Sequence, residues 1–320
     1  MEGMKLKNKK FSFSQRATTI AALIVMLIFF SFASPYFLQL ENFMTIALQT
    51  AITAITSFGL TFVIISGAND ISIGSTIALT GVVLALMLAA GWPVWLALIL
   101  TLVLGCVIGC TNGLLVAKMK LPPFIATLGA QMALRGLAMI ISDARPIYIQ
   151  NVPNFKYLAQ YRLFNVIPLP VIYMLVLCLV MGFILRKTVI GRNVFAVGSN
   201  EEAARLSGIR VTKVRVFAYM LSGLMASVAG IIMCSRVTSG QPSIATGYEG
   251  NAIASAVIGG CSMRGGEGSI LGSILGAFIL GVLMNGLNLL NVSMNWQTFA
   301  TGLVVILAVF VDKMRATEKK

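Results

Sequence analysis

Long apolar stretches, separated by short polar ones, run through nearly the whole chain. They lie at about residues 17–34, 44–66, 73–90, 94–117, 122–141, 167–185, 214–235, 247–260, 268–290 and 295–311. A helix needs roughly 20 consecutive apolar residues to cross a bilayer core. The pattern therefore predicts an all-α integral membrane protein with about ten transmembrane helices, and the runs that begin at 122 and 247 carry the weakest signal.

Lysine and arginine residues divide unevenly between the two sides of such a protein. Ten spans place both termini on one side, together with the N-terminal tail 1–16, the loop 186–215 and the C-terminal tail 312–320. This side receives 19 of the 24 Lys and Arg residues, while the other side receives four and one, Arg135, falls within a span. Basic loops stay in the cytoplasm, so we expect cytoplasmic termini. The first run is long for a secretory signal, which favours an uncleaved span.

Composition excludes several classes of protein. Of the 320 residues 58% are apolar and 11% are charged, and the chain contains no histidine. Ser-His-Asp triads and HExxH zinc sites are thereby excluded, as is a P-loop, since no Gly-Lys pair occurs. We expect no catalytic residue, metal or cofactor on this chain. The net charge of +14 gathers on one side, which favours contact with anionic lipid over binding of nucleic acid.

Two glycine-rich stretches interrupt the apolar pattern, one around Asp70 and one before Glu267. Paired interruptions of this kind are typical of transporters built from repeats, because glycine permits non-helical backbone. We expect broken helices and an internal repeat in which Asp70 and Glu267 correspond and the fifth and tenth runs close each half. The alternative is two tight turns. The expected helix-breaking glycines are Gly67, Gly74, Gly259, Gly260, Gly265, Gly266 and Gly268.

Small residues also recur at four-residue spacing within the apolar runs. Gly105, Gly109 and Gly113 form one such series. Small residues let helix backbones approach closely in lipid, so we expect these glycines to pack against another helix.

The basic loop 186–215 contains one short segment with the signals of a helix. Ser199 or Asn200 is placed to cap its start, two glutamates occupy the first turn and Gly208 ends it. A helix of two turns is marginal in water and needs a partner. On physical grounds alone, that partner is either another protein or the lipid headgroups.

The same segment resembles the coupling loop with which importer permeases dock onto an ATP-binding cassette subunit. Residues 66–75, 124–128, 241–249 and 285–290 are similar to the ribose-type sugar permeases, and the resemblance covers about residues 17–312. It implies a bacterial inner-membrane permease domain over residues 1–320, working as a homodimer with an ATPase, which holds ATP and Mg²⁺, and a periplasmic sugar-binding protein. The coupling residues would be Asn200, Glu201, Glu202, Ala203, Ala204, Arg205, Ser207 and Gly208.

Polar side chains within the spans favour a neutral cargo, because acids are scarce there. The candidates for the substrate pathway are Gln49, Thr53, Asn69, Asp70, Asn285 and Asn288, with Asn291, Gln131 and Arg135 as further candidates. Each of them is equally suited to a hydrogen bond between helices. The competing function is an ion-coupled secondary transporter of a small polar solute, in which Asp70 would bind the coupling ion.

Overall fold

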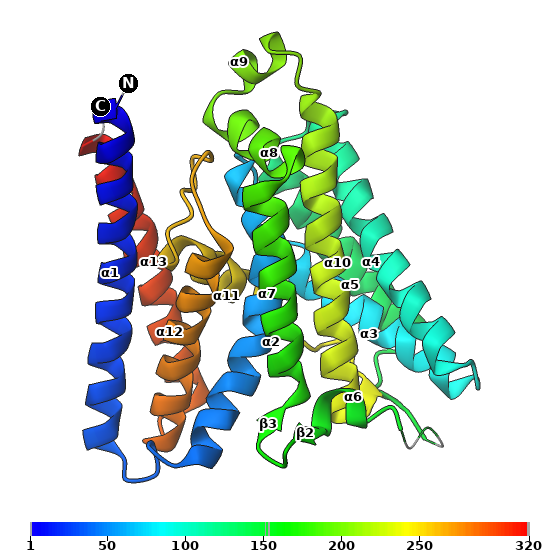
Figure 1. Cartoon of the computed structure of the whole chain (residues 1–320). Coiled ribbons are helices and arrows are strands. Elements are labelled where there is room, and N and C mark those ends of the chain that lie inside the picture. The colour runs from blue at the N-terminus through cyan, green and yellow to red at the C-terminus, as the bar shows by residue number, and fades with distance from the viewer. Residues whose placement is uncertain (1, 151, 153, 319–320) are drawn as a thin grey trace.

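The computed structural model describes residues 2–150, 152 and 154–318 as a bundle composed mainly of helices (Figure 1). Its long helices are α1 (Glu2–Ala33), α2 (Leu40–Ile65), α3 (Ile73–Ala89), α4 (Val94–Ala117), α5 (Pro123–Ile141), α7 (Leu169–Lys187), α10 (Val211–Val237), α12 (Ile270–Leu289) and α13 (Met294–Glu318). Its shorter helices are α6 (Tyr157–Gln160), α8 (Val189–Ser199), α9 (Glu201–Leu206) and α11 (Tyr248–Ile258).

The described parts of the connections contain four short strands. Antiparallel pairs are formed by β1 (Ile147–Tyr148) with β4 (Ser239–Gly240), and by β2 (Arg162–Leu163) with β3 (Ile167–Pro168). α6, β2 and β3 lie at one end of the bundle and α9 lies at the other, and we name these the α6 end and the α9 end (Figure 1). α1 begins and α13 finishes at the α9 end, so the described chain starts and stops on one side, as the even number of apolar runs predicts.

Helix length and composition identify a multi-pass membrane protein. Among the described residues, six helices are long and apolar enough to cross a bilayer, namely α2, α4, α5, α7, α10 and α12. Shorter apolar helices cover Ala17–Ala33, Ile73–Ala89 and Met294–Phe310. The run expected at 247–260 forms α11, whose 11 residues rise by only about 16 Å and do not cross a core of about 30 Å.

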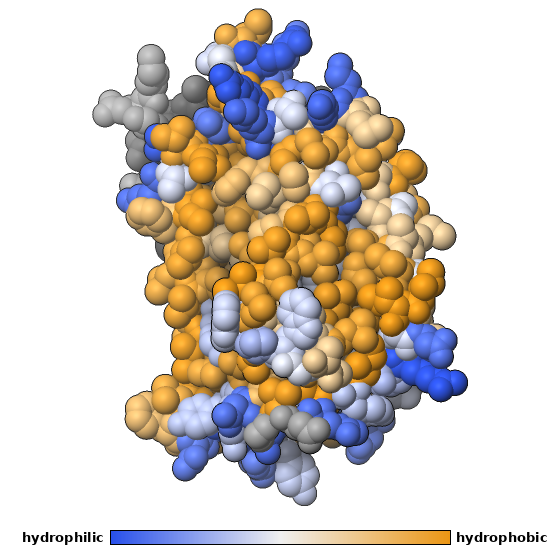
Figure 2. All heavy atoms as spheres, turned by 90° about the vertical axis from the view of Figure 1, so that its right-hand side faces the viewer, coloured by the Kyte–Doolittle hydropathy of each residue, from blue (hydrophilic) through white to orange (hydrophobic). Residues whose placement is uncertain are grey.

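A belt of hydrophobic side chains covers the outer face formed by α4 and α5. Figure 2 shows it between hydrophilic residues at both ends of the molecule. Exposed residues on α4 and α5 include Ile99, Val103, Met132 and Ile140. Since an apolar surface of this extent is unstable in water, the belt fits the lipid-facing perimeter of a membrane protein.

α2 occupies the centre of the bundle, where it packs against α7, α10, α11 and α12. Between Ala51 and Ile65 only Thr53 is not fully buried. A helix covered on every side has to be apolar or small around its whole circumference, and this one is.

Glycines bring α4 and α10 into close contact, as the four-residue spacing predicts. A methyl group added at Gly109 would meet the carbonyl oxygen of Tyr219, and one added at Gly113 would lie 2.7 Å from the Cα of Val216. Gly105 lies in the same way against Gly223. The backbones themselves therefore form this interface, in keeping with helix packing in lipid.

The two halves of the chain make matching helix contacts, but the positions that correspond are not those that the sequence suggests. α3 packs against α4 and α5 as α11 packs against α12 and α13, and α10 packs against α4 as α2 packs against α12. Exchanging α2–α5 with α10–α13 thus preserves these contacts, and α5 and α13 close the two units. The stretch after α2 then corresponds to residues 238–247 after α10, so the expected correspondence of Asp70 with Glu267 is wrong.

We predict that Gly109→Ala lowers the thermal stability of the detergent-solubilised protein, because its methyl group meets backbone atoms that cannot rotate away. The cost should be about 1–3 kcal/mol. The control is Gly136→Ala on α5, where the methyl group would meet nothing within 4 Å. That variant should be neutral or gain up to about 1 kcal/mol from helix propensity. Equal melting temperatures for the two variants would contradict the close packing of α4 and α10.

Candidate functional site

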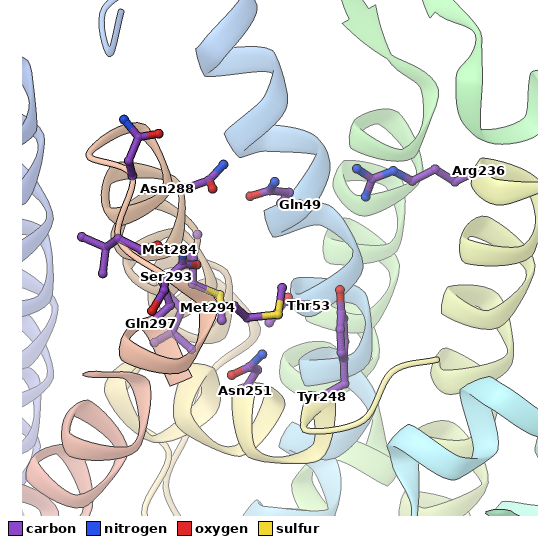
Figure 3. A pocket seen from close by; sticks show the side chains of 14 residues that line it. Gln49, Thr53, Arg236, Tyr248, Asn251, Met284, Asn288, Ser293, Met294 and Gln297 are labelled. Carbon is purple, nitrogen blue, oxygen red and sulfur yellow. Dashed lines mark hydrogen bonds between the residues drawn. The ribbon is translucent and has the colours of Figure 1, made fainter. Parts of the chain in front are cut away.

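A cavity of about 600 Å³ lies between α2, α11, α12 and α13, in the half of the bundle nearer the α6 end. Figure 3 shows side chains of α2 facing those of α12 and α13 across it. Its polar lining residues are Gln49, Thr53, Arg236, Tyr248, Asn251, Asn288, Asn291, Ser293 and Gln297. Met284 and Met294 add flexible apolar surface to the lining.

The chemistry of this lining suits a neutral molecule with many hydroxyl groups. Each amide side chain both donates and accepts hydrogen bonds, as does each hydroxyl group of a sugar. Tyr248 offers an aromatic face beside a hydroxyl group. Among the described residues that line the cavity, Arg236 is the one charged residue and no acid occurs. A cation is therefore a poorer fit than an uncharged polyol.

Three of the predicted pathway residues, Gln49, Thr53 and Asn288, meet in this cavity, and Asn291 joins them. Asn285 lies one turn away on α12 and is buried. Its Nδ2 donates to Oδ1 of Asn42 on α2 at 2.9 Å, so it forms a bond between helices instead. Sequence reasoning missed Asn251, Tyr248 and Gln297, whose polar character was visible but whose approach to α2 depends on the fold.

Asp70 and Asn69 lie elsewhere, in the stretch between α2 and α3. Asp70 is 2% exposed. Its Oδ1 accepts from the backbone N (3.0 Å) and the Oγ (2.6 Å) of Ser72, and its Oδ2 accepts from the Oγ of Ser222 on α10 at 2.7 Å. Asn112 of α4 donates to Ser72 at 2.8 Å. The carboxylate thus joins α3, α4 and α10, which is a structural role.

The Asn69 backbone carries a second link to α10. Its carbonyl oxygen accepts from the Tyr219 hydroxyl group at 2.7 Å. The turn that contains Asp70 is therefore fixed to α10 through both a side chain and the main chain, and neither Asn69 nor Asp70 lines the cavity.

The glycine-rich stretches lie where helices end, with one exception. α2 ends at Ile65 before Gly67, and α11 ends at Ile258 before Gly259. Gly74, however, lies in the first turn of α3, where its missing side chain leaves room for the carbonyl oxygen of Ala245. The backbone adopts a left-handed conformation at Gly67, Gly260, Gly265 and Gly266, but not at Gly259 or Gly268, which lie in close contacts.

The expected inner helix is α9, at the α9 end. Asn200 caps it, accepting from the backbone N of Ala203 at 2.9 Å, and Gly208 follows it in a left-handed conformation. Glu201 pairs with Arg215 of α10 at 2.6 Å. Glu202 and Arg205 are exposed and form a weaker ion pair at 3.8 Å. The Ser207 hydroxyl group donates to a backbone carbonyl oxygen of the same helix, and Ala204 is buried. The capping prediction is confirmed.

Two features of this loop were not predicted. Residues 189–199 form the helix α8, which buries Val194 and Val197. At the end of α9, Leu206 is 81% exposed among charged neighbours. The sequence pattern drew attention to the polar residues of this segment and not to Leu206.

Gln131 and Arg135 hold the segment that leads into α11. Arg135 donates through one guanidinium nitrogen to the carbonyl oxygens of Pro242 at 2.7 Å and Ile244 at 2.8 Å. Gln131 donates to Glu249 at 3.2 Å. Both therefore position the start of α11 and do not line the cavity.

A multi-pass helical bundle around a polar cavity fits a membrane transport permease. Over residues 42–309 the chain matches the family described as the permease component of the branched-chain amino acid transport system, and it belongs to that family. It is 40% identical to the ribose import permease protein of Bacillus subtilis, over 98% of this chain and 99% of the relative. The ribose import permease protein of Haemophilus influenzae is 39% identical, over 97% and 96% respectively.

A further relative is the L-arabinose transport system permease protein of Escherichia coli, at 38% identity over 99% of this chain and 97% of the relative. The resemblance to ribose-type sugar permeases is thereby confirmed. These relatives are transport proteins and not enzymes, and they do not favour the ion-coupled alternative.

We predict that Asp70→Ala lowers stability by about 1–3 kcal/mol, because it leaves the hydroxyl groups of Ser72 and Ser222 buried without their acceptor. Asp70→Asn should lose less, since a hydroxyl group can turn to accept from the new amide. Thermal unfolding in detergent measures both. Wild-type stability in Asp70→Ala would contradict the structural role of this carboxylate.

Proposed function

We propose that this chain is the membrane-spanning permease subunit of a binding-protein-dependent ATP-binding cassette importer for ribose or a similar neutral monosaccharide. The sugars after which the relatives are named, ribose and L-arabinose, support the cargo class. The observation that carries the proposal is the cavity of about 600 Å³, whose lining is rich in amide side chains. The family's own description names another cargo, which makes the cavity the more informative guide.

The cavity would form part of the sugar pathway. Gln49, Thr53 and Asn288 would exchange hydrogen bonds with sugar hydroxyl groups, and Tyr248 would pack against a sugar face. The described residues of segments 142–166 and 236–249 lie beside it toward the α6 end. The β1–β4 pair and the hydrogen bond from Gln160 to the Arg236 carbonyl oxygen at 3.0 Å connect the two segments. There the periplasmic binding protein would deliver its sugar.

Energy would come from a partner at the opposite end. The ATPase would hold ATP and Mg²⁺ and receive α9, with Leu206 as the apolar anchor and Glu202 and Arg205 at the rim. The pair of Glu201 with Arg215 would hold α9 against α10 instead of contacting the ATPase directly. This chain itself would bind no cofactor.

The topology that we propose has one transmembrane domain, residues 1–320, in a bacterial inner membrane. The tails 1–16 and 312–320 and the coupling loop 186–215 are cytoplasmic, since basic residues gather there. Ten segments enter the membrane, of which α11 is a partial crossing. A second copy of the chain completes a homodimer, and lipid covers the remaining apolar perimeter.

Sugar uptake by proteoliposomes tests the function directly. With the ATPase, ATP and the sugar-loaded binding protein, we expect ribose to accumulate; without the ATPase, accumulation should cease. Uptake that persists undiminished without the ATPase, driven by an ion gradient, would overturn the proposal.

In the same assay Gln49→Ala should lower uptake about fivefold, the equivalent of one lost hydrogen bond of about 1 kcal/mol. The matched control is Gln39→Ala, an exposed glutamine before α2 that lies outside the cavity. If both variants transport at the wild-type rate, Gln49 has no part in the pathway.

Leu206→Ala should weaken retention of the ATPase by about tenfold or more, as expected for a buried apolar anchor at an interface. Glu202→Ala, at the rim, should change retention little. Copurification of the ATPase with each variant measures the effect. The reverse order of the two variants would place the docking surface elsewhere.

A further inference from the structure

Three backbone segments from distant parts of the chain meet at the α9 end. They are the end of α2 at Ile65 and Gly67, the end of α8 at Gly198, and the connection between α11 and α12 at Gly265 and Gly266. The backbone N of Gly266 donates to the carbonyl oxygen of Ile65 at 2.8 Å. We name these five residues the glycine junction.

Backbone atoms touch directly in this junction. A methyl group at Gly198 would meet the carbonyl oxygen of Ile65 and lie 2.6 Å from the backbone N of Gly266. One at Gly265 would lie 2.8 Å from the carbonyl oxygen of Gly198 and 2.9 Å from the Cα of Gly67. No side chain can rotate to relieve these contacts, so a displacement of one segment has to move the others.

The junction adjoins the docking helix on one side. Only Ser199 and Asn200 separate Gly198 from the start of α9, and the Asn200 side chain caps that helix. α8 is itself held to the bundle through buried Val194 and Val197. A displacement of α9 is therefore transmitted to Gly198 through only two residues, Ser199 and the capping residue Asn200.

On its other side the junction adjoins the helices that line the cavity. α2 runs from Thr53 in the cavity to Ile65 in the junction, a rise of about 18 Å. α11 contributes Asn251 to the cavity and ends at Ile258, just before the connection that holds Gly265. α12 begins at Ile270, directly after that connection, and lines the cavity from Leu280 to Asn288. The helices α2, α11 and α12 therefore all run between the cavity and the same few backbone contacts of the glycine junction.

We infer that the glycine junction transmits the movement of α9 to the cavity and that Gly198 is its positioning residue. The inference rests on the proposed function, because it takes α9 as the docking site of the ATPase. Gly198 touches no cargo and no nucleotide. It sets the position of α8 relative to α2 and to the α11–α12 connection, and a larger residue would separate them.

The test compares Gly198→Ala with Gly182→Ala in the complete complex with ATPase and binding protein, reconstituted in proteoliposomes. Gly182 lies on α7, and its added methyl group would meet nothing within 4 Å. We expect Gly198→Ala to retain the ATPase and its basal ATP hydrolysis, whereas stimulation by sugar-loaded binding protein and sugar moved per ATP fall about tenfold or more. Gly182→Ala should match the wild type. Full stimulation and full uptake per ATP in Gly198→Ala would overturn the inference.

A second measurement needs no variant and decides the question if Gly198→Ala does not assemble. Hydrogen exchange of the native complex is compared with and without a non-hydrolysable ATP analogue. Protection should change together in residues 196–206 and 262–268, and a change confined to residues 196–206 would overturn the inference. Wild-type uptake that needs no ATPase would instead refute the proposed function, so the two failures are distinguishable.

Discussion

The burial of α2 between Ala51 and Ile65 is the constraint on which the rest of the structure depends. A helix surrounded by α7, α10, α11 and α12 cannot shift without displacing its neighbours. Its one incompletely buried position between Ala51 and Ile65 is Thr53, which opens onto the cavity. The same helix therefore fixes one wall of the cavity and, through the Ile65 carbonyl oxygen, one side of the glycine junction.

Packing in lipid explains why glycine occupies so many contacts. Apolar side chains gain little by leaving lipid for a protein interior, so close van der Waals contact of backbones has to hold the helices together. Gly109 against Tyr219 is a contact of this kind, and Gly198 against Ile65 is an equally close backbone contact at the α9 end. In the first, close contact stabilises the fold; in the second, it also links the end of α8 to the end of α2, whose other half lines the cavity. Glycine at Gly198 thus supports mechanism as well as stability.

Local signals in the sequence predicted the local features well. Hydropathy located the apolar helices, and the pair of Asn200 and Gly208 delimited α9, because capping depends on neighbouring residues. The four-residue glycine spacing predicted the contact surface on α4, although not its partner α10. Gln49, Thr53 and Asn288 were identified as polar residues within spans, where such residues are costly.

Features that depend on the tertiary arrangement escaped prediction. Asn285 and Asn288 are one turn apart, yet only Asn288 lines the cavity, because Asn285 is hydrogen-bonded to Asn42 of α2. Asp70 resembles an ion ligand in sequence but is enclosed by hydroxyl groups from Ser72 and from Ser222 on another helix. The register of the repeat was misjudged because similar glycine-rich sequences occur at positions that packing makes inequivalent.

The central claim is that ATP binding by an ATPase docked at the α9 end controls access to the cavity near the α6 end. Labelling of Thr53→Cys by a membrane-impermeant thiol reagent tests it most directly, in the assembled complex with and without a non-hydrolysable ATP analogue. The parent chain, with its five cysteines, sets the background, and Gln39→Cys, exposed before α2, controls for reagent access. The account predicts that the labelling rate of Thr53→Cys changes with the nucleotide while that of Gln39→Cys does not. An unchanged rate at Thr53→Cys in both states would contradict it.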